Sequence, residues 1–360
     1  MAEAARLTAR AAIALAVDAF TEHAPPPAAP SAAPDGPLAW DGYGAARARA
    51  AERTGESESV VFGEAEVSGV RCAVLAFEFG FLGGSLGERT GDRLCAAYRL
   101  ARERGMPLVS LVATGGSRMQ EGMVALTQLQ RVAREAVLAR EAGVPHVSVL
   151  RDPATGGGWA TVGAGADVVL ALPGAQVGFA GARVRPADAD PAAYTAEGQL
   201  AAGHVDAVVP AGGLRTALGH WLTALARPAP AAVPPPSPPG GAGGLPESGW
   251  EAVRRARDAA RPRAEAYLEA YFDRRLPLVG DRCGGTDPGM LCGIGLRDGY
   301  GVAYAAQCGT ATRPAGYRTA ARVIRLADRL GLPVLTLVDT PGAANDAEAE
   351  RAGAGAAIAE

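Results

Sequence analysis

The sequence predicts an α/β fold built from repeated ββα units and arranged as two similar domains. Three stretches carry this prediction, at 105–116, 143–158 and 331–342. Each contains a glycine that ends a helix, then a short aliphatic run, then a glycine-rich or Pro-Gly turn. Short apolar runs bounded by glycine and proline favour strands covered on both faces over helices. Each stretch needs several residue types in a fixed order, so chance does not explain three of them.

Composition supports a globular protein of two ordinary domains. The chain has 360 residues, of which 48% are hydrophobic but only 5% aromatic, so alanine, valine and leucine must fill the core. The net charge is −3, and the chain contains no lysine and no basic run. This charge pattern argues against nucleic-acid binding.

Cysteine usage and hydropathy indicate a cytoplasmic protein in a reducing compartment. Five cysteines are scattered without a CxxC pair, which supports neither a disulfide framework nor a zinc site. No stretch approaches the roughly 18 apolar residues that a membrane span needs. An apolar stretch at 11–17 is interrupted by Asp18 and lacks a clear cleavage site, so a signal peptide is not indicated.

The first predicted domain covers 35–227 and follows a flexible N-terminal segment, 1–34, made of an alanine-rich helix and a Pro/Ala tract. Two strands at 60–67 and 70–77 flank Ser68-Gly69, a two-residue hairpin turn. The other expected elements of this domain are a helix at 43–53, a glycine-rich loop at 80–88, helices ending at Gly105 and Gly143, a strand at 107–112, and strand-like runs at 164–172 and 176–179.

The second predicted domain covers 248–360 and follows a Pro/Gly linker at 228–247, which is too poor in apolar side chains to pack. Its expected elements are an arginine-rich helix at 250–272, a hairpin around Asp298-Gly299, a helix ending at Leu330, and a strand that leads to Asp339.

Equal spacings indicate an internal duplication. Gly331 minus Gly105 is 226, and Gly299 minus Gly69 is 230. Adding 226 to Gly157 gives 383, which lies past Glu360. We therefore expect the second domain to be incomplete, without a counterpart of the 156–158 loop.

The glycine turns are candidates for oxyanion binding. Two glycines between a strand and a helix let the main chain approach a ligand, and the helix N-terminus adds free donors and partial positive charge. Such a place can hold a developing oxyanion. From the residues alone, Gly115 and Gly116 fit a plain helix-start turn equally well.

These motifs resemble the carboxyltransferase component of acetyl-CoA carboxylase, in the crotonase-like (ClpP/crotonase) superfamily. The β-like part carries the resemblance in Phe77–Gly87, Gly115–Glu121, Asp152-Pro153 with Gly156-Gly157, and Gly178–Gly181; the α-like part carries it in Pro314–Arg318 and Asp339–Ala343. The chain thus resembles a fusion of the two subunits in a crotonase-like spiral. It departs from the family in lacking the four-cysteine zinc ribbon and in a shorter loop between Gln307 and Tyr317.

The resemblance implies transfer of a carboxyl group from carboxybiotin, held on a separate carrier protein, to the α-carbon of an acyl-CoA, with acetyl-CoA giving malonyl-CoA. It assigns one oxyanion hole, for the thioester oxygen, to Gly115, Gly116, Gly157 and Gly158. A second hole, for the ureido oxygen of biotin, would use Gly342 and Ala343. A loop near the acyl-CoA would use Gly83, Gly84 and Ser85.

The same resemblance implies partners: an acyl-CoA, a biotin carboxyl carrier protein, a biotin carboxylase and a second copy of the chain in a homodimer or larger oligomer. Zinc is not expected, because the four-cysteine ribbon is absent, and the charge pattern and hydropathy indicate neither nucleic acid nor a membrane as a partner. Two other functions remain open: a malonyl-thioester decarboxylase of the malonate decarboxylase type, and a non-catalytic subunit that binds acyl-CoA.

Polar side chains offer weaker candidates. Ser117 suggests a protease of a related fold, but His146 lies in a buried strand pattern and His204 in a packing motif, which favour structural roles. Arg118 fits either an ion pair that holds the turn or a ligand contact.

Overall fold

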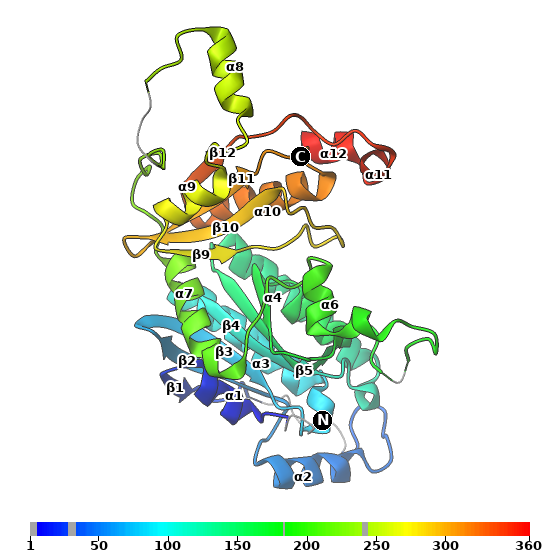
Figure 1. Cartoon of the computed structure of the whole chain (residues 1–360). Helices are drawn as coiled ribbons and strands as arrows, with labels where there is room; N and C mark the ends of the chain where they lie inside the picture. Colours follow the sequence, from blue (N-terminus) through cyan, green and yellow to red (C-terminus); the bar gives the residue numbers. More distant parts are fainter. Residues whose placement is uncertain (1–5, 28–33, 183, 240–243) are drawn as a thin grey trace. The chain divides into compact units, whose positions relative to one another are not determined.

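The computed structural model describes residues 6–27, 34–182, 184–239 and 244–360, and the chain divides into two compact units between Leu222 and Thr223. Figure 1 shows the elements of both units. The boundary falls inside helix α7 (Leu214–Ala226), a few residues before the boundary that the sequence suggested.

The first unit is built on a mixed sheet, which has eight strands within its described residues. The strand order is β1-β2-β3-β4-β5-β6-β8, with β7 paired to β5. The first three strands pair antiparallel and the others parallel. The strands are β1 (Ala19–Glu22), β2 (Val60–Val67), β3 (Val70–Phe77), β4 (Leu108–Thr114), β5 (His146–Thr155), β6 (Val168–Ala171), β7 (Val177–Gly178) and β8 (Ala207–Val208).

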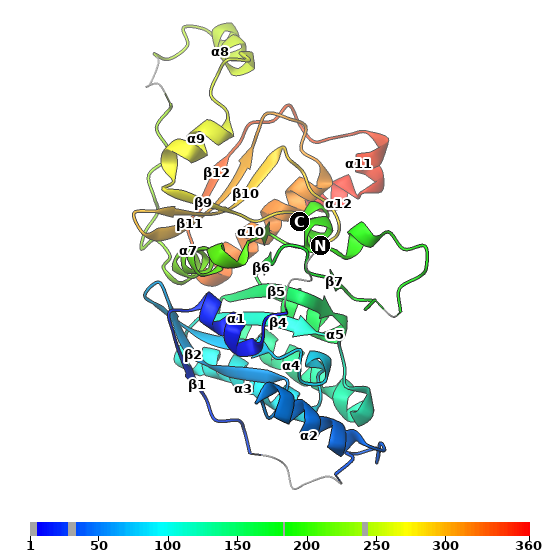
Figure 2. The ribbon, with the colours of Figure 1, turned by 60° about the horizontal axis from the view of Figure 1, so that its bottom comes forward.

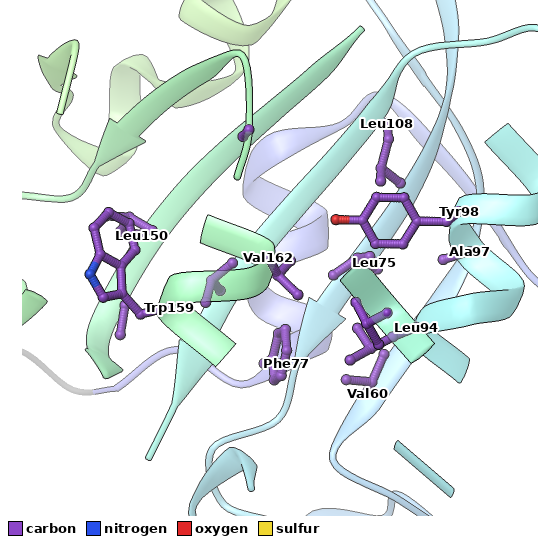
Figure 3. Close-up of a cluster of buried hydrophobic side chains, with 14 of the residues drawn as sticks. Val60, Leu75, Phe77, Leu94, Ala97, Tyr98, Leu108, Leu150, Trp159 and Val162 are labelled. Atoms are coloured by element: carbon purple, nitrogen blue, oxygen red, sulfur yellow. The ribbon is translucent and has the colours of Figure 1, made fainter. Parts of the chain in front are cut away.

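The helices of the first unit are, besides α7, α1 (Ala9–Ala16), α2 (Tyr43–Thr54), α3 (Glu88–Arg104), α4 (Met123–Glu141), α5 (Gly156–Gly158) and α6 (Ala196–Ala201). Of these, α1 and α3 pack on the sheet, and α4 packs on α3. The face of α3 that carries Leu94 and Tyr98 is buried, as the periodicity predicts, and it meets Leu75 and Leu108 of the sheet (Figure 3). Gly105 ends α3 in the left-handed conformation with φ +58°.

The N-terminal segment corrects one expectation. We predicted that 1–34 is flexible, but residues 6–27 are described as part of the fold. Ala9, Ala12 and Ala16 of α1 are at most 2% exposed, and β1 adds a strand beside β2. Alanine side chains are small enough to let this helix lie close to the sheet. The remaining residues, 1–5 and 28–33, lie outside the described residues.

The second unit has a four-stranded sheet within its described residues, in the order β12-β11-β10-β9. Its strands are β9 (Arg274–Pro277), β10 (Met290–Arg297), β11 (Tyr300–Gln307) and β12 (Val334–Leu337), and its helices are α8 (Gly249–Arg257), α9 (Ala264–Tyr271), α10 (Pro314–Leu330), α11 (Ala347–Arg351) and α12 (Ala354–Ala359). The single helix predicted at 250–272 is two helices, separated by a segment that contains Pro262. Helix α8 projects from this unit (Figure 2) and buries none of its residues.

The predicted linker is wrong in its first part. Ala229 and Val233 pack against the core of the second unit, and the Tyr271 hydroxyl donates to the Pro234 carbonyl at 2.6 Å. Proline and alanine side chains thus find enough apolar surface to order this segment. Residues 240–243 of the linker lie outside the described residues.

Apart from α2, which has no counterpart between β9 and β10, the two units repeat one run of main elements: helix, strand, hairpin, helix and strand. Helix α1 and strand β1 recur as α9 and β9, displaced by 255 (264 minus 9, and 274 minus 19). The hairpin β2–β3 recurs as β10–β11, displaced by 230 (290 minus 60), and α3 with β4 recurs as α10 with β12, displaced by 226 (314 minus 88). The duplication therefore begins with α1, which explains why the N-terminal segment is folded.

Candidate active site

The turn after β4 is tighter than the sequence suggested. The Gly115 amide donates to the Gly83 carbonyl at 2.9 Å, and the Gly116 amide donates to Thr114 Oγ1 at 3.0 Å. We expected both amides to be free donors, and this part of the prediction is wrong. The reason is partly local, because a threonine at the end of the strand closes a side-chain turn two residues later.

The next residue, Ser117, has a different environment. It forms a parallel bridge with Leu86: the Leu86 amide donates to the Gly116 carbonyl at 2.9 Å, and the Arg118 amide donates to the Leu86 carbonyl at 2.9 Å. The flanking residues face Leu86, so the Ser117 amide faces the other side. It has no partner among the described residues. Sequence analysis considered only the side chain of Ser117 and missed its amide.

The turn after β5 retains free donors. Gly156 has φ +66°, and its amide donates to the Phe179 carbonyl. Gly157 and Gly158 lie in the first turn of a helix that continues as a π-helical turn to Gly163. First-turn amides have no acceptor within a helix. Those of Gly157 and Gly158 have no acceptor elsewhere among the described residues. They therefore provide two neighbouring donors at a helix N-terminus.

The two turns lie against each other. A Cβ added at Gly156 would lie 2.8 Å from the Gly116 Cα, and one added at Gly158 would lie 2.6 Å from Thr114 Cγ2 and 3.0 Å from Leu86 Cδ1. Only glycine fits at these distances. The structure thus brings together Gly116 and Gly156–Gly158, which lie 40 or more residues apart in the chain.

The loop at Gly83–Ser85 supports the first turn. Gly84 has φ +61°, and a Cβ added there would lie 2.2 Å from the Ala113 carbonyl oxygen. The Gly83 carbonyl accepts from Gly115, and both the carbonyl and the hydroxyl of Ser85 accept from Arg118. A contact of these residues with acyl-CoA stays a prediction; their observed partners lie within the fold.

Arg118 forms an ion pair inside the protein. Its side chain is 0% exposed and meets Glu58, which is 1% exposed, in a bidentate pair at 2.5 and 3.0 Å. Burial alone would raise the pKa of Glu58, but the charge and hydrogen bonds of Arg118 outweigh burial and hold that pKa below its ordinary value. Between the two roles left open for Arg118, these contacts favour the ion pair.

The histidine of β5 belongs to the core. His146 is 7% exposed and shares a 2.9 Å hydrogen bond with the buried Ser110 hydroxyl. The ring thus bonds Ser110 on the neighbouring strand, which agrees with the structural role that the sequence favours. A hollow of only about 10 Å³ adjoins His146, which is too small for a peptide.

The second unit contains the same turn 226 residues later. The Gly342 amide donates to Thr340 Oγ1 at 3.0 Å, the Thr312 amide to the Gly342 carbonyl at 3.3 Å, and the Ala344 amide to the Thr312 carbonyl at 2.9 Å. The Ala343 amide, which corresponds to that of Ser117, has no partner among the described residues. Gly342 itself is therefore not a free donor, whereas Ala343 is.

A hollow of about 410 Å³ lies in the second unit beside the carboxyl end of β12. Arg261 and Arg263 line it and pair with Asp339 at 2.5 and 3.4 Å. In the parts of the chain that the structure describes, no helix is long and apolar enough to cross a membrane, and no group of three His, Cys, Asp or Glu could hold a metal ion.

Two family models match most of the chain, and curated relatives match 85 to 99% of it. Residues 40–208 match the carboxyl transferase domain, and residues 247–360 match the acetyl co-enzyme A carboxylase carboxyltransferase-like family. The chain is 41% identical over 381 residues to the acetyl-coenzyme A carboxylase carboxyl transferase subunits beta/alpha of Salinispora arenicola, covering 99% of this chain and 67% of that protein. The chain belongs to the acetyl-CoA carboxylase carboxyltransferase family.

Other members of the carboxyltransferase family are similar over much of their length. A probable biotin-dependent acyl-coenzyme A carboxylase beta3 subunit of Mycobacterium tuberculosis is 35% identical over 89% of this chain and 66% of its own. The subunits beta/alpha of Salinispora tropica are 41% identical over 85% of this chain and 59% of their own. The chain spans 54 to 67% of the length of the curated relatives of this beta/alpha type.

Solved structures confirm the crotonase-like fold. A transcarboxylase 12S structure has a TM-score of 0.74 at 18% identity, covering 98% of this chain and 68% of its own. A single-chain, multi-domain long-chain acyl-CoA carboxylase has a TM-score of 0.72 at 21% identity, covering 98% of this chain and 36% of its own. The suspected family and its fold are thus both confirmed.

Proposed function

We propose that this chain moves a carboxyl group from carboxybiotin on a carrier protein to the α-carbon of an acyl-CoA, and that its substrate is acetyl-CoA, which becomes malonyl-CoA. The observation that carries the proposal is the pair of first-turn amides at Gly157 and Gly158, placed against a second turn with a third free amide at Ser117. Membership of the carboxyltransferase family supports the same reaction.

The chemistry needs donors of this kind. Removing a proton next to a thioester creates an enolate, whose negative charge collects on the former carbonyl oxygen. Amides that are already in place stabilise this charge without reorganisation, and loss of one such donor costs roughly 3–4 kcal/mol in related oxyanion holes. The partial positive charge at the helix N-terminus adds to the effect of Gly157 and Gly158. Biotin, when bound, supplies the carboxyl group and accepts the proton.

The biotin side would use the second unit. The Ala343 amide is a free neutral donor, which suits a ureido oxygen, and Thr340 holds the turn through its own hydroxyl. Only one donor of this second hole comes from Gly342 and Ala343, because the Gly342 amide already has an acceptor. The partners implied are a biotin carboxyl carrier protein, a biotin carboxylase and further copies of this chain; one structural relative is described as a hexamer.

Acetyl-CoA is proposed because the beta/alpha relatives carry that substrate in their names. The test supplies the protein with a biotinylated carrier, biotin carboxylase, ATP and labelled bicarbonate, and compares acetyl-CoA, propionyl-CoA and a long-chain acyl-CoA. We expect labelled malonyl-CoA as the main product. Labelled product from only a longer acyl-CoA would overturn the substrate, and no product from any acyl-CoA would overturn the activity.

The two other functions predict different results, which a decarboxylation assay and a binding measurement would show. Release of CO2 from malonyl-CoA without biotin would replace the proposal by a decarboxylase. Binding of acyl-CoA in calorimetry, with no turnover in either direction, would replace it by a non-catalytic subunit.

A further inference from the structure

Arg118 is the centre of a buried polar cluster in the first unit, which we call the Arg118 cluster: Tyr43, Glu58, Ser59, Ser85, Thr90, Arg118 and Glu121. Its guanidinium donates to both oxygens of Glu58, to the hydroxyl of Ser85 at 3.1 Å and to the carbonyl of Ser85 at 2.8 Å. Weaker contacts reach Ser59, Thr90, Tyr43 and Glu121, between 3.2 and 3.4 Å. Each of the three guanidinium nitrogens thus already has an acceptor inside the protein, and none is left for a ligand.

The charges in the Arg118 cluster are balanced by two different means. Glu58 is neutralised by its bidentate pair with Arg118. Glu121 lies at the N-terminus of α3: its Oε2 accepts from the Glu88 amide at 2.6 Å, and its Oε1 accepts from the Tyr43 hydroxyl at 2.5 Å. A carboxylate at this end of a helix is stabilised by the helix dipole. The cluster therefore joins α2, α3, the start of β2 and the turn in one connected network.

This network leads directly to the proposed donors. Arg118 holds Ser85 through its side chain and Leu86 through its amide, and Leu86 in turn holds the Gly116 carbonyl. Leu86 also packs on the helix start, since a Cβ added at Gly158 would lie 3.0 Å from Leu86 Cδ1. Leu86, which Arg118 holds, thus contacts both the 116–118 turn and the start of the helix that carries Gly158.

The second unit shows what the turn is like without such an arginine. The position that corresponds to Arg118 is Ala344, and the hydrogen bond that corresponds to Leu86–Gly116, between Thr312 and Gly342, is 3.3 Å long and not 2.9 Å. Residues 341 and 342 are exposed. The backbone pattern thus forms in both units, but the first turn is held by a buried arginine, whereas in the second the buried Thr312 hydroxyl accepts from Gln307 at 2.9 Å.

We propose that Arg118 is a positioning residue for the thioester side of the reaction: it holds Leu86 and the 116–118 turn so that the amides of Ser117, Gly157 and Gly158 share one geometry. This inference rests on the proposed function. Arg118 does not touch the substrate, because its side chain is fully buried. Small displacements of groups around a reacting centre can cost about 100-fold in rate.

The test compares three variants in the carboxylation assay, using the full protein with its carrier and carboxylase. Arg118→Lys keeps the charge but loses the fork that reaches Glu58 and Ser85 together. Glu58→Gln keeps the shape but loses the charge. The control is Glu135→Gln, because Glu135 is likewise buried, at 3% exposed, and paired with Arg99 and Arg102, but its pairs join α3 to α4 and lie outside the Arg118 cluster.

We expect Arg118→Lys and Glu58→Gln to lower kcat by about 10- to 100-fold while KM for acyl-CoA changes less than about threefold, because the amides act on charge that develops after binding. We expect Glu135→Gln to lower the thermal midpoint with kcat unchanged, measured well below that midpoint. Equal kcat in all three variants would overturn the positioning role. An inactive parent protein would instead overturn the proposed function, so the two failures are distinguishable.

Discussion

The turns at 114–118 and 340–344 share three hydrogen bonds in very different surroundings, while the bond from the Gly115 amide to Gly83 has no counterpart, because residue 341 is a proline without an N–H. In both, a glycine amide donates to the hydroxyl of a threonine two residues earlier at 3.0 Å, and the following residue bridges to a loop before a long helix. In the first unit, all seven residues of β4, which leads to the turn, are buried between β3 and β5. In the second, β12 pairs only with β11 among the described strands and is alternately exposed.

This comparison separates what determines the shape of the turn from what makes the turn rigid. The shape of the turn is local, because the threonine hydroxyl and the glycine at positive φ are enough to form it twice. Its rigidity is not local, because the buried arginine, its glutamate partners and the second glycine turn come from distant parts of the chain. The following experiments test this distinction, from the largest expected effect to the smallest.

Replacing Arg118 should lower the free energy of unfolding far more than replacing Arg313, which lies beside the second turn. Arg118→Met leaves Glu58 buried without its counter-charge, for an expected loss of about 3–5 kcal/mol in the free energy of unfolding. Arg313→Met breaks a pair with Asp346 whose arginine side chain is 39% exposed, and should cost less than about 1 kcal/mol. Urea denaturation followed by circular dichroism measures both. Similar losses would contradict a difference in rigidity between the turns.

Alanine at a glycine should be tolerated better in the second turn. Gly156→Ala combines positive φ with a Cβ 2.8 Å from the Gly116 Cα, and we expect a loss of about 3 kcal/mol in the free energy of unfolding. At Gly342 φ is also positive, but a Cβ added there would have no atom within 4 Å, so we expect Gly342→Ala to lower the free energy of unfolding by about 1–2 kcal/mol. If Gly342→Ala proved the more damaging in thermal unfolding, the second turn would be more tightly packed than described.

Acidification should weaken the two units to different extents. Burial would raise the pKa of Glu58, but the charge and hydrogen bonds of Arg118 hold it below the ordinary 4.5. Burial would likewise raise the pKa of Asp281. It lies below the ordinary 3.8 because the carboxylate accepts from the amides of Gly285 and Cys283 and pairs with Arg318. A lowered carboxyl pKa gives stability that is fully present above the unfolded value and is lost as pH falls through the folded value.

The variants Glu58→Gln and Asp281→Asn should therefore flatten the fall in stability below about pH 4.5 and pH 3.8, respectively. We expect the larger change for Glu58→Gln, because Arg118 is 0% exposed while Arg318 is 25% exposed and screened by water. Unfolding midpoints between pH 3 and pH 7 measure the slopes. A slope unchanged in Glu58→Gln would show that the pair does not contribute to acid stability.

Thiol labelling should distinguish the units with little effect on activity. Cys72 and Cys95 of the first unit are buried, and burial raises the pKa of the Cys72 thiol to about 12. Cys283 of the second unit is exposed. Brief treatment with iodoacetamide at pH 8, followed by peptide mass mapping, should modify Cys283 and leave Cys72 unmodified until the protein is unfolded. Early modification of Cys72 would show that the first unit opens readily.

Much of the fold follows from the sequence because its signals are local. The hairpins at Ser68-Gly69 and Asp298-Gly299, the helix stops at Gly105 and Gly331, and the equal spacings between them predict the elements and the duplication. The alanine-rich helix near the N-terminus is predicted, but its packing is not, since an alanine-rich segment followed by prolines carries no local sign that it packs on a sheet. The linker was misjudged for the same reason: its partners, such as Tyr271, lie in a distant segment.

The candidate site divides in the same way. The sequence by itself determined the family, the glycine turns and the residues that permit close approach. Only the tertiary structure decided which amides stay free, because the acceptor of Gly115 is the carbonyl of Gly83 and the partner of Arg118 is a glutamate 60 residues away. Hydrogen-bond acceptors and counter-charges are chosen by proximity in space, and proximity in space is what a linear pattern does not contain.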